Sequence, residues 1–401
     1  MPLWANALAT TMLVQTVGAF ILFAVPVIGP VLTEAAGLPG ESIGYLSALS
    51  ALGVCWLLSN GVPMLAQYGP VHMLQIGLVL GVLGFAAICT AWWPLAVLGA
   101  VVMGFGYATN NPASSEILVR TAPARNRVLV FSLKQAGVPL GAMLTGLIVA
   151  PLVGLYGLPG VTLLMLALGS TALLLVQPAR TRLDPPGDRM RTAWFPALFS
   201  WRVMRNLVSA LALHPSLPMF TALGLSFAIL QACLTAFLVT YLVTRHGFSL
   251  AEGGLIAATM QGANLIARIT LGWLADRIGN AQLQLAVQGF LAAAALAALA
   301  LHQPVSGDPV TYALVALAGF TGTSWNGLHI AESARLSPPG RVGEVTSAVN
   351  LFGFVGSVSG PILFALLVQA TGSYAVAFLL ASVQLCLVCL LALRRIPRRA
   401  V

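Results

Sequence analysis

Two basic side chains stand inside long apolar stretches of the sequence, Lys134 and Arg268. Lys134 follows Arg127 by seven positions and Arg268 precedes Arg277 by nine, which on a helix corresponds to about 10 and about 13 Å. A charge in such surroundings is costly and marks a functional position by default. Because no acid occurs at a similar depth, two such cations would attract an anion, the Arg through a bidentate fork and the Lys as a point charge.

Each cation also has a structural explanation. Lys134 is the single lysine of the chain, and its long stem would allow the ammonium to snorkel to a surface. Arg268 would be satisfied by a carbonyl group or by an acid nearby. For Lys134 the depth therefore favours a functional role. For Arg268 both substrate contact and a structural pair remain open.

Amide side chains are the other polar groups in the apolar stretches. They can donate and accept hydrogen bonds and so orient a small ligand, or they can bridge two helices for a modest gain in stability. The candidates for substrate contact, beside the two cations, are Gln15, Asn111, Gln231, Asn264, Asn326 and Asn350.

Acids and arginines at the ends of apolar stretches form a second kind of pattern. Glu116 precedes Arg120 by four residues and Glu332 precedes Arg335 by three, so each pair lies on one helix face. We expect these pairs, together with Asp276 and Arg277, to form a cytoplasmic gate, with a proton site as the alternative for the two glutamates.

The elements that must position these residues follow from composition. The 401 residues are 59% hydrophobic and 7% charged, against about 25% charged residues in a soluble domain. This excludes a soluble globule, and the continuous apolar runs exclude a β-barrel. The five cysteines and five histidines show no disulfide or metal-ligand pattern, and no phosphate loop occurs, so we expect no cofactor. The net charge of +9 lies in loops and gives no basis for nucleic-acid binding.

Spacing of the apolar runs predicts an all-α membrane protein with twelve transmembrane helices. Arginines concentrate in every second loop, in the central linker and in the C-terminal tail, which places both termini on the cytoplasmic side. The linker contains Trp194 and Arg202, a mixture that suits either a surface helix or a plain tether. The expected domains are a six-helix half at 1–177, a linker at 178–216 and a second half at 217–401. The expected spans are 8–32, 42–65, 72–93, 95–119, 128–153, 158–177, 217–243, 251–274, 281–301, 309–334, 342–368 and 374–393.

An internal repeat connects the halves. Identical residue types recur 216 positions apart in both halves of the sequence. Because each half contains six spans, the repeats enter the membrane in the same orientation, related by a pseudo-twofold axis along the membrane normal. Lys134 then corresponds to Asn350, which is also polar. The matching pairs are Gln15 and Gln231, Asn110 and Asn326, Glu116 and Glu332, Pro123 and Pro339, Arg125 and Arg341, and Gly137 and Gly353.

Residues 272–279 read Gly-Trp-Leu-Ala-Asp-Arg-Ile-Gly and resemble the loop motif of the major facilitator superfamily. The equivalent stretch of the first half has Ala66 and Gln67 in place of the Asp and Arg, so one half keeps the motif. The resemblance extends over the whole chain and implies secondary transport. Arg268 resembles the eighth-helix Arg of monocarboxylate transporters, although Asn264 replaces their acid. The stretch Asn110-Asn111-Pro112 loosely resembles the cyanate-transporter-like branch.

These observations predict import of a small organic or pseudohalide-like anion, with protons as the expected coupling ion. A drug or metabolite exporter is the alternative, although Gly-Pro occurs at Gly360-Pro361 and not in the fifth span, where drug antiporters usually have it. A membrane-embedded enzyme and a transport-dead sensor are further readings. The abundant alanine and the 18 arginines against one lysine are typical of a GC-rich bacterium. We therefore expect this multi-pass protein to lie in a bacterial inner membrane, in contact with lipids and as a monomer.

Overall fold

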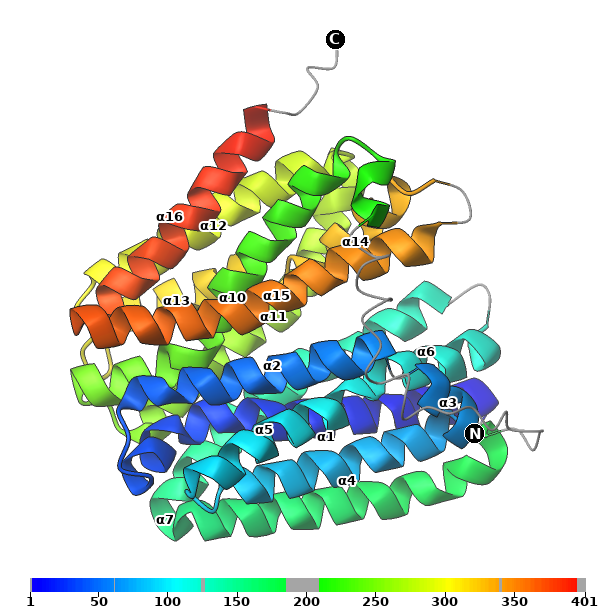
Figure 1. Ribbon diagram of the computed structural model, residues 1–401, viewed down its shortest axis with the longest axis horizontal. Helices are drawn as coiled ribbons and strands as arrows, with labels where there is room; N and C mark the ends of the chain where they lie inside the picture. The colour runs from blue at the N-terminus through cyan, green and yellow to red at the C-terminus, as the bar shows by residue number, and fades with distance from the viewer. Residues whose placement is uncertain (1, 61, 124–126, 185–208, 339–340, 395–401) are drawn as a thin grey trace. The chain divides into compact units, whose positions relative to one another are not determined.

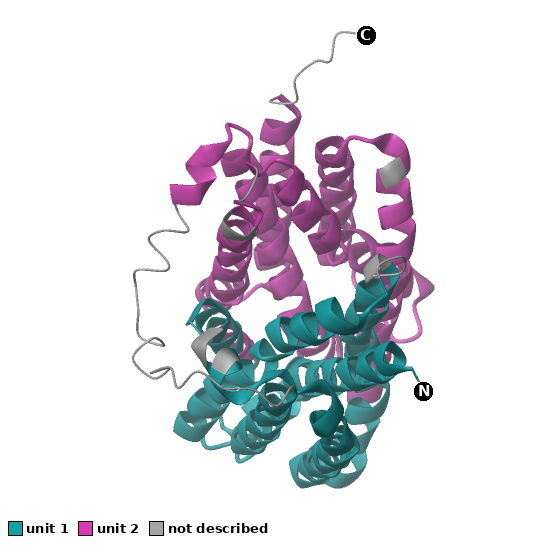
Figure 2. Ribbon diagram, turned by 90° about the vertical axis from the view of Figure 1, so that its right-hand side faces the viewer, with its two compact units in different colours: residues 1–40, 49–203 teal, residues 41–48, 204–401 magenta. Residues whose placement is uncertain are grey.

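The structure is a computed structural model that describes residues 2–60, 62–123, 127–184, 209–338 and 341–394. The side chains at 62, 63, 66, 127, 128, 276, 343 and 344 lie outside the description. The chain divides into two compact units, the first formed by residues 1–40 and 49–203 and the second by residues 41–48 and 204–401 (Figure 2).

All regular elements in the described residues are helical (Figure 1). The helices from the first half of the sequence are α1 (Leu3–Ala35), α2 (Ile43–Asn60), α3 (Val62–Tyr68), α4 (Pro70–Ile88), α5 (Trp93–Ala108), α6 (Asn110–Thr121) and α7 (Arg127–Leu183), with a 3-10 turn at Gly40–Ser42. The second half contains a 3-10 turn at Leu211–Leu213, then α10 (Leu217–His246), α11 (Leu250–Ile278), α12 (Ala281–Leu301), α13 (Pro309–Gly322), α14 (Asn326–Arg335), α15 (Val342–Thr371) and α16 (Tyr374–Arg394).

Several expected spans differ from the observed helices. The span expected at 42–65 corresponds to α2 and the start of α3, with residue 61 between them outside the described residues. The spans expected at 128–153 and 158–177 join in α7 around Gly157, whose φ of 63° interrupts the helix. The span at 95–119 consists of α5 and α6, which separate at Thr109. Pro112 has no N–H to donate to the preceding turn, and this explains the interruption. The span at 309–334 is likewise interrupted between α13 and α14.

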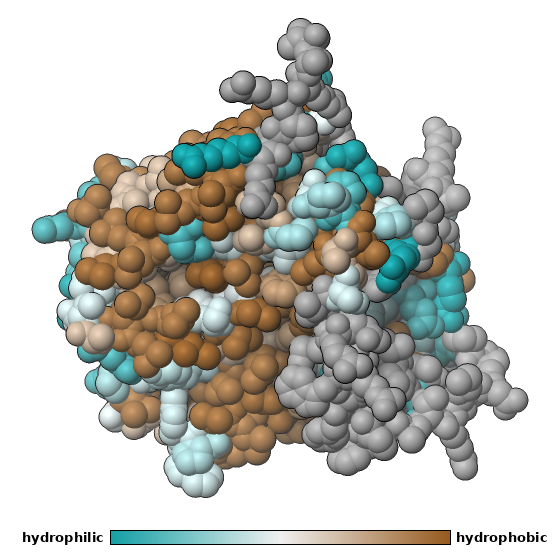
Figure 3. All heavy atoms as spheres, turned by 45° about the horizontal axis from the view of Figure 1, so that its top comes forward, coloured by the Kyte–Doolittle hydropathy of each residue, from teal (hydrophilic) through white to brown (hydrophobic). Residues whose placement is uncertain are grey.

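Eight of the described helices or merged helices are long and apolar enough to cross a membrane by length and composition. Large apolar side chains remain exposed on them, including Leu155 at 76%, Leu174 at 75% and Leu301 at 72%. Figure 3 shows how widely hydrophobic residues occupy one face of the molecule. A surface of this kind is unfavourable in water and suits contact with lipid.

Within each unit the same kinds of helices pack together, α1 on α7 and α4 on α5 in the first, and α10 on α15 and α12 on α13 in the second. Glycines allow the backbones to approach. A Cβ atom at Gly141 of α7 would lie 2.3 Å from the carbonyl oxygen of Thr16, and one at Gly356 of α15 would lie 2.6 Å from that of Leu225. Small residues therefore set the helix–helix distance in both units.

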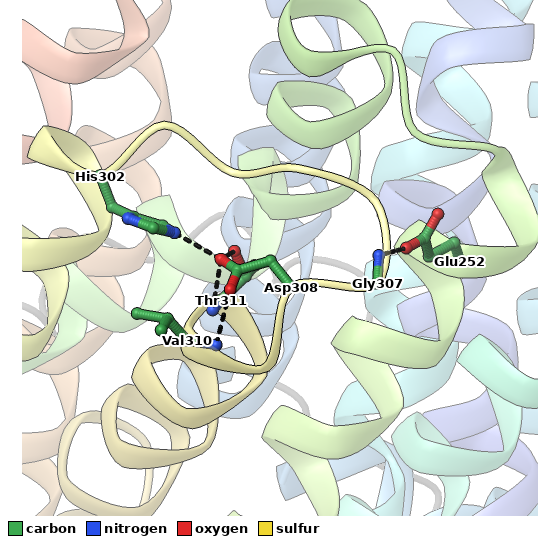
Figure 4. A network of polar contacts seen from close by, with 6 residues as sticks. All are labelled: Glu252, His302, Gly307, Asp308, Val310 and Thr311. Atoms are coloured by element: carbon green, nitrogen blue, oxygen red, sulfur yellow. Dashed lines mark hydrogen bonds and ion pairs between the residues drawn. The ribbon is translucent and has the colours of Figure 1, made fainter.

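The connection between α12 and α13 is held by carboxylates (Figure 4). Asp308 caps α13 by accepting the backbone N–H of Val310, and it also bonds His302 Nε2 at 2.5 Å. Glu252, near the start of α11, accepts hydrogen bonds from Ser306 Oγ and the Gly307 N–H, both at 2.7 Å. These bonds satisfy the helix ends and connect three segments of the second unit.

Candidate functional site

Lys134 is the most unusual side chain in the first unit. It lies on α7 and is only 3% exposed. Its Nζ donates to Asn111 Oδ1 on α6 at 2.8 Å and to Gln135 Oε1 at 3.3 Å. Among the described side chains, no ion pair joins it to a carboxylate. The single lysine of the chain is therefore buried against two neutral amides and does not extend to the surface.

Two helices position this amine. The first part of α7 packs on α1, where a Cβ atom at Gly137 would meet the hydroxyl of Thr16 at 2.9 Å, and α7 also contacts α6. Asn111 is exposed although its carbonyl oxygen binds Lys134. Because an exposed amide on such a helix is expected to face water rather than hydrocarbon, the amine lies close behind a polar surface.

A second polar group of the first unit includes two residues that sequence reasoning did not select, Tyr107 and Asn110. Gln15 is fully buried, and its Nε2 donates to Tyr107 Oη at 3.1 Å. Among the residues that the structure describes, the side-chain oxygens of Gln15 and Asn110 have no hydrogen-bond partner. Tyr107 and Asn110 also line a small pocket with Gly18, Gly77 and Gly106, so one of these side-chain acceptors lies at a small opening. The pair Asn110-Asn111 in an otherwise apolar stretch was the one sequence feature that could have indicated this polar group.

In the second unit, Arg268 lies on α11 and is half-buried. Its Nε donates to Asn264 Oδ1 at 3.3 Å, one helical turn away, and Asn264 Nδ2 donates to Gln261 Oε1 at 3.2 Å. Asn264 is 4% exposed. The two sequence candidates of this helix are therefore in contact, and Gln261 extends their polar row.

Gln231 contacts an aromatic group in the second unit. Trp325 donates its Nε1 hydrogen to Gln231 Oε1 at 2.8 Å and stacks on Phe227 with centroids 5.6 Å apart. His329, only 2% exposed, lies edge-on to Trp325 and bonds the carbonyl oxygen of Phe220 at 2.7 Å. Sequence reasoning did not assign a role to His329, because no spacing connects it with Phe220, which lies on another helix.

The remaining amide candidates differ in exposure. Asn326, at the start of α14, is exposed, and Asn350 on α15 is half-buried. Neither is joined to the Gln231–Trp325 pair by a hydrogen bond among those described. Their substrate contact stays a prediction.

The acid–arginine pairs lie where the helical spacing brings them together. Glu116 Oε1 is 3.5 Å from Arg120, whose guanidinium also donates to the carbonyl oxygen of Leu183 at 3.0 Å. Glu332 accepts from Arg335 Nε at 2.7 Å, and this hydrogen bond together with the negative charge raises the pKa of Arg335. Their role as a gate stays a prediction.

The third expected gate pair is described in part. Arg277 lies over the ring of Trp273, 3.9 Å from its centroid, and the side chain of Asp276 lies outside the described residues. In the part of the chain that is described, no group of three or more His, Cys, Asp or Glu side chains is arranged to hold a metal ion.

Comparison with known proteins identifies the family of this chain. Residues 8–332 match the family model of the Major Facilitator Superfamily. An uncharacterized MFS-type transporter of Mycobacterium tuberculosis is 22% identical over 367 residues, which cover 88% of this chain and 77% of that protein. A probable nitrate/nitrite transporter of the same organism, NarK2, is 32% identical over 150 residues, or 37% of each chain.

Solved structures show the same fold at low sequence identity. A bacterial homolog to the human lysosomal transporter Spinster, in an inward-facing and occupied conformation, has a TM-score of 0.74 at 16% identity over 99% of this chain and 98% of that chain. A peptide transporter POT in complex with sulfate has a TM-score of 0.77 at 15% identity over 98% and 94%. With the match of the family model over most of its length, the chain belongs to the Major Facilitator Superfamily and is a helical membrane transporter rather than an enzyme.

Proposed function

We propose that this protein is a secondary active transporter that carries a small organic anion across a bacterial inner membrane, coupled to proton uptake. The observation that carries this proposal is Lys134, an amine 3% exposed whose two hydrogen-bond partners are neutral amides. A buried cation without a carboxylate partner is costly unless a ligand supplies the negative charge. An anion at the exposed face of Asn111 would do so.

Arg268 is the proposed second contact. It belongs to the second unit, and its Nε donates to Asn264. Its planar guanidinium is proposed to orient a carboxylate. Local similarity to a probable nitrate/nitrite transporter supports an anionic rather than a cationic cargo. Gln15, Gln231, Asn326 and Asn350 are proposed to complete the substrate contacts.

The proposed architecture follows the sequence repeat. α5 with α6 and α13 with α14 would each form one span, and α7 would form two on either side of Gly157, giving twelve helices. We propose six-helix halves at 1–177 and 217–401, related by a pseudo-twofold axis along the membrane normal, with the linker at 178–216 and both termini in the cytoplasm. The monomer would alternate access through the pairs Glu116–Arg120 and Glu332–Arg335 and through Asp276 and Arg277.

Uptake into proteoliposomes tests the function. The protein is purified, reconstituted and supplied with radiolabelled pyruvate, cyanate or nitrate, and separately with tetraethylammonium. We expect uptake of at least one of the anions and no uptake of the cation. Lys134→Gln should lower anion affinity by about tenfold or more, because a hydrogen bond to a charged group contributes about 1.5–3 kcal/mol.

Arg245→Gln is the matched control. It also removes one positive charge, but Arg245 is exposed and bonds the carbonyl oxygen of Gly372. Uptake by this variant should equal that of the unaltered protein. Transport of tetraethylammonium without transport of the three anions would instead support a drug exporter, and binding of an anion without flux would support a sensor.

A further inference from the structure

The surroundings of Lys134 leave unused donor capacity. An ammonium carries three N–H groups, a neutral amine carries two, and the described contacts provide two acceptors, Asn111 Oδ1 and Gln135 Oε1. Two amide oxygens therefore satisfy both N–H donors of the neutral amine. The charged form needs one more acceptor, and a bound anion would supply both that acceptor and the opposite charge.

The charged groups on neighbouring helices do not take this place. α7 packs on α1, α4 and α6. Glu34 is the one charged side chain of α1 and lies in its last turn, while Gly137, three residues after Lys134, meets the opposite part of α1 near Met12. On α6, Glu116 lies five residues beyond Asn111, about 7.5 Å along the helix, and pairs with Arg120.

The other titratable groups of this region also lie away from the amine. His72 is the one titratable side chain of α4, at the start of that helix, and Asp184 is occupied with the backbone N–H groups of Val71 and His72 at 2.8 and 3.3 Å. α7 itself carries Arg180 and Arg182 near its C-terminal end and Tyr156 at its middle, and the side chain of Arg127 lies outside the described residues. Among the described side chains, the amine of Lys134 therefore has neutral surroundings.

We propose that Lys134 is itself the proton carrier of the transport cycle, so that the anion and the proton meet at one nitrogen atom. This inference rests on the proposed function. In the empty site the nitrogen holds its lone pair and donates two hydrogen bonds to the amides. A proton from water is then accepted by the lone pair, and the resulting ammonium binds the anion with its third N–H.

The exchange is balanced on both sides of the membrane. When the anion leaves on the other side, the ammonium loses the charge that stabilised it and releases its proton to water, and the neutral amine returns. No redox step occurs, and the anion and the proton cross together without net charge. Anion movement is then coupled to proton movement because either one alone would leave a buried charge unpaired.

Replacing Lys134 with Arg separates charge from titration, because a guanidinium remains protonated in proteins. Proteoliposomes containing a pH-sensitive dye are supplied with pyruvate, cyanate and nitrate, with and without an acid exterior. In the unaltered protein, we expect acid outside to accelerate uptake and the dye to report a proton entering with each anion. Lys134→Arg should retain exchange of labelled for unlabelled anion, lose the acceleration by acid, and generate a membrane potential during net uptake.

A second variant keeps the lysine and changes its partner. Asn111→Asp preserves size but places a carboxylate 2.8 Å from the amine, which would hold the ammonium charged. We expect it to lose the acceleration by acid as Lys134→Arg does. Asn280→Asp is the control, because Asn280 caps α12 and Asp serves equally well there, so proton coupling should be unchanged.

The outcomes distinguish the two proposals. If Lys134→Gln abolishes anion uptake but uptake by the unaltered protein is indifferent to pH, the anion site stands and the proton role of Lys134 is wrong. If Lys134→Arg keeps acid-accelerated uptake, the proton is carried elsewhere, and Glu332 and His329 are the groups to examine. If Lys134→Arg does not fold, Asn111→Asp gives the same test. If none of the three anions is taken up, the proposed function itself fails.

Discussion

The carboxylate of Asp308 combines a helix cap with an ion-pair partner. It accepts hydrogen bonds from His302 Nε2, from the Val310 N–H and from Thr311. The bond from His302 contributes most, and together these bonds lower the pKa of Asp308 from 3.8 to about 2. The bonds therefore favour the charged carboxylate in the folded state.

The effect of pH on stability follows from this shift. A carboxyl group whose pKa is lower in the folded state stabilises the protein above its unfolded pKa, and this contribution disappears as the pH falls through the folded pKa. We predict that Asp308→Asn, which can still cap α13, lowers the melting temperature at neutral pH. The difference from the unaltered protein should close as the pH falls from about 4 to about 2. A difference that stays constant over this range would contradict the assignment, and thermal unfolding in detergent measures it.

Two glutamines at equivalent repeat positions make similar contacts. Gln15 on α1 donates to Tyr107, and Gln231 on α10 accepts from Trp325. Each glutamine thus bonds an aromatic side chain close to a helix break, the one between α5 and α6 or the one between α13 and α14. Tyr107 and Trp325 themselves are not 216 positions apart. The two positions, 216 residues apart in the sequence, thus share the amide while its aromatic partner differs.

At the level of helices, glycines determine how closely two backbones approach. A Cβ atom at Gly141 would lie 2.3 Å from the Thr16 carbonyl oxygen, and the neighbouring Cβ of Ala19 would be 2.9 Å away. Backbone atoms cannot move aside as a flexible side chain can. The contact between α1 and α7, which also positions Lys134, therefore depends on this glycine.

We predict that Gly141→Ala destabilises the protein by about 1–3 kcal/mol, the usual cost of overpacking. Gly154→Ala is the matched control, because Gly154 lies on the same helix and a Cβ atom there meets nothing within 4 Å. Thermal unfolding of both variants in one detergent makes the comparison. Equal melting temperatures would show that the α1–α7 contact relaxes without cost.

For the whole molecule, the distribution of arginines predicts orientation. Arginines lie in alternate loops and at the C-terminus, and the positive-inside rule places these segments in the cytoplasm. The loop between α12 and α13 then faces the outside, and the end of α7 faces the inside.

Cysteine labelling tests this orientation. In intact cells, Ser306→Cys should react with a membrane-impermeant maleimide, while Thr181→Cys should react only after the cells are permeabilised; both positions are exposed. The parent chain with its five cysteines provides the baseline. Labelling of Thr181→Cys in intact cells would reverse the assignment.

Much of the architecture could be predicted from the sequence because it depends on local properties. An apolar composition with few charges requires helices, since every backbone N–H and C=O must bond within its own segment in lipid. Helix-terminating residues such as Gly279 and Asn280 also act locally: Gly279 adopts a φ of 64° and Asn280 accepts the N–H of Leu283. The spacing of Glu116 and Arg120 likewise predicted their proximity.

Contacts between distant residues were decided by the tertiary structure. The sequence indicated Lys134 as a buried cation but not that Asn111 would hold it, because no periodicity relates residues on different helices. Likewise, Tyr107 and His329 acquire their partners through packing with Gln15 and Phe220. Hydropathy and charge are properties of single residues and short windows, whereas a hydrogen bond between helices depends on the packing of the whole unit.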